Sequence, residues 1–109
     1  MGNYSEEYLE YILDQLSLVS DVEVKKMFGG IGLFRNGLMF GMIDGDTFRL
    51  KADDSNRADF EARRMGQFTT GSGKQGMPYW AVPADVIDDK ATLRMWADKA
   101  YAAAVAAKR

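Results

Sequence analysis

The sequence predicts an α+β fold, a two-layer sandwich of an antiparallel sheet with helices, in the order α-βββ-α-ββ-α. Three observations support this class. Apolar residues recur with a helical period near both ends of the chain and with a period of two across residues 22–52. Asn36-Gly37, the strongest hairpin signal, joins two of these strands directly. The strands cluster between helices rather than alternating with them, which favours an antiparallel sheet over a βαβ nucleotide-binding fold.

The first helix is expected over about residues 5–19. Ser5 is a suitable N-cap because its hydroxyl can accept a hydrogen bond from the first helical turn. The residues that repeat at helical spacing and should face the core are Leu9, Ile12, Leu13, Leu16 and Val19. A second stripe consists of Tyr4, Tyr8 and Tyr11. These tyrosines are either half-buried rings at the edge of the core or a surface for self-association, since Tyr is common in interface cores.

The first expected strand ends with Ile31–Arg35, and the second covers Leu38–Ile43. Gly29-Gly30 interrupts the first strand, so we expect a bulge or a sharp bend there. Both faces of the second strand are nearly apolar, which is typical of a strand that is covered on both sides or lies under a partner. Met39 and Ile43 are therefore candidate self-association residues.

The third strand has one apolar face and one basic face. Phe48, Leu50 and Ala52 alternate with Thr47, Arg49 and Lys51. Since successive side chains of a strand point to opposite faces, Arg49 and Lys51 should share a solvated face.

A short helix is expected to begin at Asp54 or Ser55 and to end near Arg64. Gly66 is the expected residue just past its C-terminus, where glycine is common.

The remaining elements are two strands, Gln67–Thr69 and Met77–Val82, and a last helix that starts at Asp88 or Asp89. The core-facing stripe of that helix is Leu93, Trp96, Ala97, Ala100, Tyr101 and Ala104.

The 109 residues include no Cys and no His, which excludes disulfides, thiol nucleophiles, zinc cages and imidazole bases. Residues 71–76 match the G-x-G-x-x-G pattern, but a strand follows them where a dinucleotide site needs a helix, so we expect a mobile solvent loop. The paired aspartates fall at turns and helix starts, where Asp serves the backbone. We therefore expect no enzyme activity, no cofactor and no metal site, and we assign no catalytic residue.

Charge is unevenly distributed along the chain. Residues 1–23 contain six acids and no base, whereas the remainder contains 14 bases and 10 acids. The acidic first helix and the basic remainder could attract each other within one fold or between two copies. The candidate contacts for a protein partner or for nucleic acid are Lys25, Lys26, Arg49, Lys51, Arg63 and Arg64. The alternative is that these cations are ordinary solubilising charge.

The N-terminal sequence lacks the basic and apolar regions of a signal peptide, and no apolar run approaches the roughly 20 residues that span a bilayer. We expect a cytoplasmic protein with no membrane partner.

Several segments together resemble the TfoX (Sxy) N-terminal domain family. They are Lys25–Phe34 (KKMFGGIGLF), Phe40–Ile43, Phe48–Asp53, Phe60–Ala62, Met77–Pro83 and the Leu93, Trp96, Ala97, Ala100 stripe. The resemblance covers about residues 5–105, and the M-F-G-G and M-x-Y-x-x-V-P segments are its most specific parts.

The resemblance implies a two-layer α+β domain like that of small secretion chaperones, which commonly dimerise. Longer members of the family regulate natural competence together with a cyclic-AMP-dependent transcription activator and carry a second, C-terminal helical domain. We expect residues 1–109 to form one TfoX N-terminal-like domain without that second domain. The family supplies no catalytic residues.

The expected function is a non-enzymatic regulatory or adaptor domain that contacts a protein, with transcription machinery as a candidate partner, and forms a homodimer. The alternatives are a regulator that binds nucleic acid directly and a domain that binds a small molecule between sheet and helices.

Overall fold

The structure is a computed structural model and describes residues 5–27, 30–69 and 76–108. Its elements are α1 (Glu6–Gln15), β1 (Val22–Met27), β2 (Gly30–Arg35), β3 (Leu38–Asp44), β4 (Thr47–Lys51), α2 (Arg57–Ala62), β5 (Gln67–Thr69), β6 (Gly76–Ala81), α3 (Ala84–Ile87) and α4 (Lys90–Lys108). Within these residues the strands form one sheet of six, in the order β1-β2-β3-β4-β6-β5, and each neighbouring pair is antiparallel. The predicted α+β class with an antiparallel sheet is confirmed.

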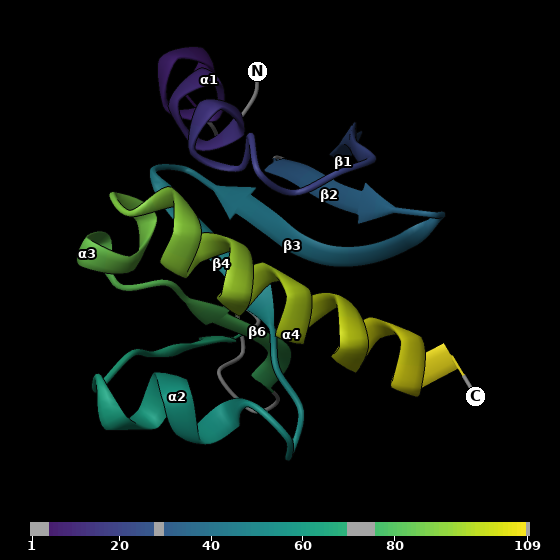
Figure 1. Ribbon diagram of the computed structural model, residues 1–109, viewed down its shortest axis with the longest axis vertical. Coiled ribbons are helices and arrows are strands. Elements are labelled where there is room, and N and C mark those ends of the chain that lie inside the picture. The colour runs from purple at the N-terminus through teal and green to yellow at the C-terminus, as the bar shows by residue number, and fades with distance from the viewer. Residues whose placement is uncertain (1–4, 28–29, 70–75, 109) are drawn as a thin grey trace.

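The described helices pack on one face of this sheet, with α4 crossing it between α1 and α2 (Figure 1). Strand register explains why that face is apolar. Ile31 of β2 lies opposite Ile43 of β3, which lies opposite Phe48 of β4. These three side chains and their alternating neighbours Leu33 and Leu50 are fully or almost fully buried. Burying them against the helices supplies the main driving force for the two-layer fold.

The second helix is held by aromatic packing. Phe60 is 1% exposed, and its ring centroid lies 4.9 Å from that of Trp96 on α4 and 6.1 Å from that of Trp80 on β6. The Phe60–Trp96 pair is edge-to-face, an arrangement favoured by the charge distribution of aromatic rings.

Residues 22–35 form two antiparallel strands rather than one strand, so of the bulge or sharp bend expected at Gly29-Gly30 the bulge is wrong. Met27 pairs with Gly30, which means that the chain reverses between them, and Gly29 lies outside the described residues. Gly30 is needed for a different reason, because a Cβ there would lie 2.6 Å from the Ile43 carbonyl oxygen. The irregularity in register lies instead between β2 and β3, where the pairing shifts between Leu33 and Phe34.

Three short-range signals gave the right local structure. Asn36 and Gly37 have φ angles of 51° and 78°, as a two-residue hairpin turn requires. The Ser5 hydroxyl caps α1 by accepting a hydrogen bond of 3.2 Å from the Tyr8 amide. Asp89 likewise caps α4, because its carboxylate accepts from the Ala91 amide at 3.3 Å. The first helix ends at Gln15, whereas the sequence predicted an end near residue 19. Leu16 and Val19 are nevertheless buried beyond the end of the helix.

The ends of α2 differ from expectation. Asn56, rather than Asp54 or Ser55, precedes the helix, and its buried side chain bridges the Lys51 carbonyl and the Asp53 amide. Arg64, rather than Gly66, takes the left-handed conformation after the helix, with a φ of 58°. Its amide donates to the Glu61 carbonyl, and the Met65 amide donates to the Phe60 carbonyl. This pair of bonds closes the helix end whichever residue occupies the left-handed position.

The helix α3, which follows Pro83, is an addition to the predicted order.

Replacing Gly30 with Ala should destabilise the fold by about 1–3 kcal/mol, because the new methyl group collides with backbone that cannot move aside. Urea denaturation of purified protein measures this change. Gly66→Ala is the matched control, since no atom lies within 4 Å of the added Cβ and the backbone there is ordinary. Equal unfolding midpoints for the two variants would contradict the close approach of β2 and β3.

Candidate functional site

The face of the sheet opposite the helices is the first candidate surface. Register places every second residue of the strands on this face, the acids Glu23 and Asp44 among them, and we call it the open face. Its cationic, apolar and aromatic members are Lys25, Met27, Phe34, Met39, Met42, Arg49, Lys51 and Tyr79. Arg49 and Lys51 share this face and point away from Phe48 and Leu50, as the alternation predicts. Among the described residues, no helix packs across it, and only the C-terminal end of α4 reaches it, where Ala104, Ala107 and Lys108 line a hollow with Met39, Lys51 and Tyr79.

At the β1–β2 end, the open face is covered by its own side chains. A Cβ on Gly32 would lie 2.5 Å from the Met27 sulfur and 2.8 Å from the Phe34 ring, so both side chains fold over this glycine. The Lys25 ammonium lies 4.9 Å from the centre of the Phe34 ring, within cation–π range. Met27 nevertheless remains 40% exposed. This end therefore presents apolar atoms beside a cation.

At the β4–β6 end, a tyrosine ring lies under a second cation. Tyr79 is only 6% exposed, its hydroxyl donates to the Met39 carbonyl at 3.4 Å, and burial raises its pKa. The Lys51 ammonium lies 5.2 Å from the ring centre. Beside them, the Arg49 guanidinium donates to the Gly66 carbonyl at 3.5 Å, and partial burial lowers the pKa of Arg49.

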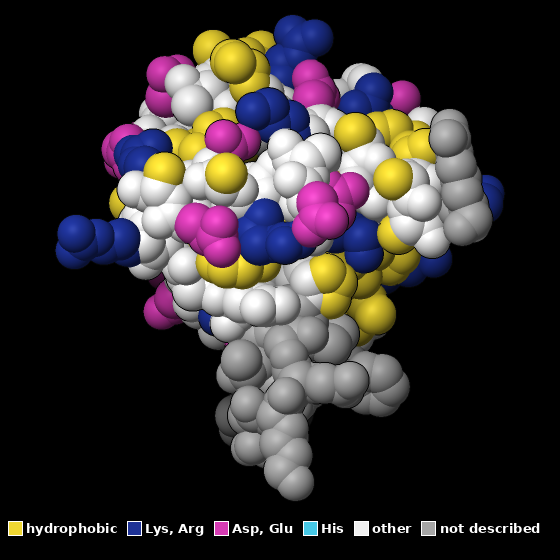
Figure 2. Space-filling view, turned by 90° about the horizontal axis from the view of Figure 1, so that it is seen from below, with side chains coloured by type: hydrophobic (Ala, Val, Ile, Leu, Met, Phe, Trp, Pro, Cys, Tyr) yellow, Lys and Arg dark blue, Asp and Glu magenta, His cyan; other side chains and the backbone are white. Residues whose placement is uncertain are grey.

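The other predicted cations lie elsewhere. Lys26 pairs with Ile31 and so points to the opposite side of β1 from Lys25. Arg63 and Arg64 follow α2, where Arg63 forms an ion pair with Asp85. On the side of the molecule that contains α2, acidic and basic side chains are interspersed (Figure 2). The six predicted contacts therefore do not form one basic patch, and only Lys25, Arg49 and Lys51 share the open face.

The predicted self-association residues also separate. Tyr4 lies outside the described residues. The rings of Tyr8 and Tyr11 are 6.2 Å apart on α1, but Tyr8 packs against the core while Tyr11 is 39% exposed. Met39 lies on the open face. Ile43 is 0% exposed and belongs to the core, so it offers no surface for a second copy and we drop it from the set.

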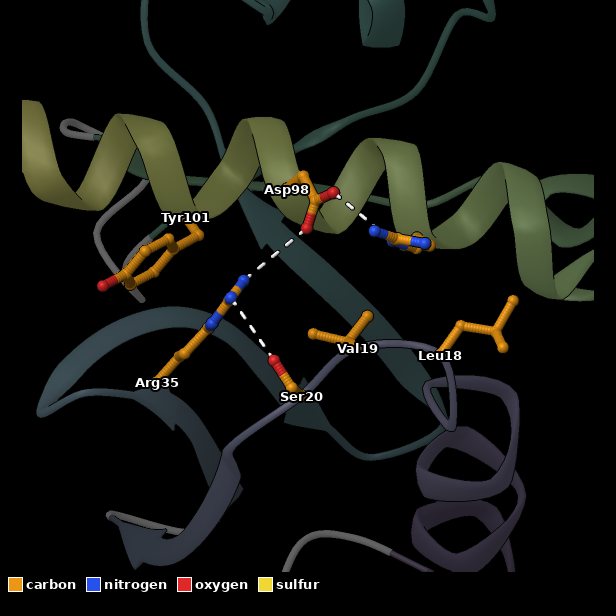
Figure 3. Close-up of a pocket in the computed structure, with 7 residues that line it drawn as sticks. Leu18, Val19, Ser20, Arg35, Asp98 and Tyr101 are labelled. Carbon is orange, nitrogen blue, oxygen red and sulfur yellow. Dashed lines mark hydrogen bonds and ion pairs between the residues drawn. The ribbon is translucent and has the colours of Figure 1, made fainter.

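A second candidate is a hollow of about 250 Å³ between β2, α4 and the connection from α1 to β1 (Figure 3). Arg35 extends from the end of β2 into it, toward Asp98 at 3.6 Å and Ser20 at 3.4 Å. Its guanidinium lies 4.7 Å from the centre of the Tyr101 ring. The predicted site residues do not include Arg35. The alternation of side chains along β2 could have identified Arg35, because Arg35 points to the same face of the sheet as the buried residues Ile31 and Leu33.

In residues 5–27, 30–69 and 76–108, no group of three or more acidic side chains is placed to hold a metal ion. Across the same ranges, none of the helices combines the length and the apolar character needed to cross a membrane. The G-x-G-x-x-G loop lies almost wholly outside the described residues.

A comparison with protein-family models identifies a family for this chain. The family model described as the TfoX N-terminal domain matches residues 14–104. The chain belongs to the TfoX N-terminal domain family. The match includes β1 through β6 and most of α4, and therefore both candidate surfaces of this TfoX N-terminal domain. A direct comparison with curated proteins finds no match.

Tyr11 gives a prediction for pH dependence. Its hydroxyl donates a hydrogen bond to Asp88, which raises the pKa of Tyr11 from 10.0 to about 12. The fold therefore favours the protonated phenol, and this contribution to stability is present below pH 10 and lost as the pH rises to about 12. Asp88→Asn should return the pKa of Tyr11 toward 10.0. The measurement is a pH titration followed by ultraviolet absorbance. Subtracting the titration of the matching Tyr11→Phe chain isolates the signal of Tyr11.

Asp85→Asn is the control for that titration, because Asp85 pairs with Arg63 rather than with a tyrosine. A Tyr11 titration that is unchanged by Asp88→Asn would show that the contact does not persist in solution.

Proposed function

We propose that this TfoX N-terminal domain is a non-enzymatic regulatory adaptor that acts by protein contact at the open face and forms a homodimer. The observation that carries the proposal is a sheet face that no helix packs across in the described part of the chain, on which partly exposed Met and Phe side chains lie beside cations. Methionine, aromatic residues and arginine are the side chains that protein interfaces favour.

The chain itself offers a surface that complements the open face. Glu7, Glu10, Tyr11 and Asp14 are spaced i, i+3, i+4 and i+7 along α1 and are exposed, on the side away from the buried Ile12. This acidic stripe, with one aromatic ring in it, matches Lys25, Arg49 and Lys51 in charge. Because α1 lies on the helix side of the sheet, α1 of one copy meets the open face of the other copy in a head-to-tail contact. The proposed occupant of the open face is therefore α1 of a second copy.

The regulatory part of the proposal comes from the family. Longer members that carry this domain regulate competence genes, so we propose that the dimer is an adaptor for the transcription machinery. The lack of Cys and His in the sequence supports a role without catalysis.

Direct binding of single-stranded nucleic acid is the second candidate, favoured by the cations and aromatic rings on the open face of an antiparallel sheet. Two contacts weaken it. Tyr79 is almost fully buried, and Lys25 lies over the Phe34 ring, so neither ring has a free face for stacking a base. Fluorescence anisotropy with labelled single-stranded and duplex DNA at low salt tests this candidate. Salt-sensitive binding that is lost in Arg49→Glu/Lys51→Glu would support it over the dimer.

Charge reversal on either side should weaken the dimer. We expect Arg49→Glu/Lys51→Glu, and separately Glu7→Lys/Glu10→Lys, to raise the dimer dissociation constant about tenfold, since each reversal turns attraction into repulsion. Mixing the two variants should restore association, because the reversed charges complement each other again. Sedimentation velocity across a micromolar concentration series measures both effects.

Arg64→Glu, which makes the same kind of charge change at the end of α2, should leave the dissociation constant unchanged. A wild-type chain that stays monomeric at several hundred micromolar would overturn the homodimer. Failure of the mixed variants to associate would overturn the pairing of α1 with the open face.

A further inference from the structure

The Arg35 hollow lies on the helix side of the sheet, apart from the open face, and it is built around one fixed cation. The Arg35 side chain is only 24% exposed, although it is charged. One side of its guanidinium faces the Tyr101 ring, and the Tyr101 hydroxyl in turn accepts a hydrogen bond of 3.1 Å from the Asn36 amide group. The turn and α4 thus hold the guanidinium in one place before any ligand arrives, which lowers the entropy lost on binding.

The hydrogen-bonding capacity of this guanidinium is largely unused. Charge-assisted bonds of arginine normally measure about 2.7–2.9 Å. Arg35 lies 3.6 Å from the Asp98 carboxylate and 3.4 Å from the Ser20 hydroxyl, and its buried Nε makes no hydrogen bond within the described part of the chain. By contrast, Arg63 contacts Asp85 directly.

A second arginine faces the same carboxylate. The Nε of Arg94 lies 3.7 Å from the other oxygen of Asp98, so Asp98 stands between two arginines without bonding closely to either (Figure 3). Asp98 is 48% exposed and can turn out to solvent. The three groups carry a net charge of +1, which becomes +2 when Asp98 swings away.

The geometry points to a phosphate-monoester site, in which the phosphate replaces Asp98 between Arg35 and Arg94. A phosphate dianion balances two arginines, and its tetrahedral oxygens can accept from both guanidinium groups and from the Ser20 hydroxyl at once. The hollow, of about 250 Å³, has room for a phosphate group and for part of the molecule that carries it. Leu18, 50% exposed at the rim, would meet whatever carries the phosphate. Asp98 then acts as an internal competitor for the ligand.

This role for Asp98 gives opposite expectations for two substitutions. Asp98→Asn should tighten phosphate binding at least about threefold, because it removes both the competing acceptor and the repulsion. Arg35→Lys should weaken binding at least about fivefold, because an ammonium cannot make the paired bonds of a guanidinium. A cluster that serves only to join β2 to α4 would not bind phosphate more tightly after Asp98→Asn.

The test is a titration of isotope-labelled chain with inorganic phosphate, followed by NMR, with sodium chloride at matched ionic strength as the reference. We expect saturating shifts at Ser20, Arg35 and Tyr101 in phosphate alone, and the order of affinity Asp98→Asn, wild type, Arg35→Lys. Arg63→Lys is the matched control and should titrate like the wild type. Arg94→Gln, at a more exposed position, replaces Arg35→Lys in the comparison if the latter does not fold.

Parallel titrations with a sugar phosphate and with a phosphoserine peptide separate a metabolite from a modified protein as the source of the group. Tighter binding than inorganic phosphate in either arm supports the site and identifies its carrier. Shifts that follow ionic strength alone, or weaker binding after Asp98→Asn, would overturn the proposal. These outcomes do not depend on the dimer, because Arg35 and Asp98 take no part in the open face.

Discussion

The structure depends on the packing of the described helices against a single face of the sheet. The alternation of β2, β3 and β4 sends Ile31, Ile43 and Phe48 to that face, and the helices bury them. A two-layer domain of this kind must leave its other sheet face without a helix. The open face is therefore a direct result of the way the core is made, and its Met, Phe and Tyr side chains limit their exposure by packing on one another and under cations.

The same alternation explains why the second candidate site lies where it does. Arg35 has the parity of the core residues before it, but it comes at the end of β2, where the core gives way to solvent. A cation in that position must find partners on the neighbouring helix, and α4 supplies Tyr101 and Asp98. Arg49 and Lys51 have the other parity and lie on the open face. One rule of strand geometry thus sorts the basic residues into two chemically different surroundings.

Sequence reasoning succeeded where the signal was local. The turn at Asn36-Gly37 and the caps at Ser5 and Asp89 depend on neighbouring residues alone. It failed where a distant contact decides. Gly30 is a glycine because of the Ile43 carbonyl, which no short window of sequence reveals. The end of α2 is closed by the bonds from the Arg64 and Met65 amides, with Arg64 rather than a glycine in the left-handed conformation, and Phe60 of its last turn packs against the distant Trp96.

The exposed edge of the sheet has a consequence for solubility. In the part of the chain that the structure describes, β1 pairs only with β2, which leaves its other side open to pairing with foreign strands. Glu23, Lys25 and Lys26 stand along this strand, and all three side chains are exposed. A strand of another molecule that paired with β1 would have to bring its backbone close to these acidic and basic side chains. This discourages growth into fibrils. The domain can thus keep a long free strand without polymerising through it.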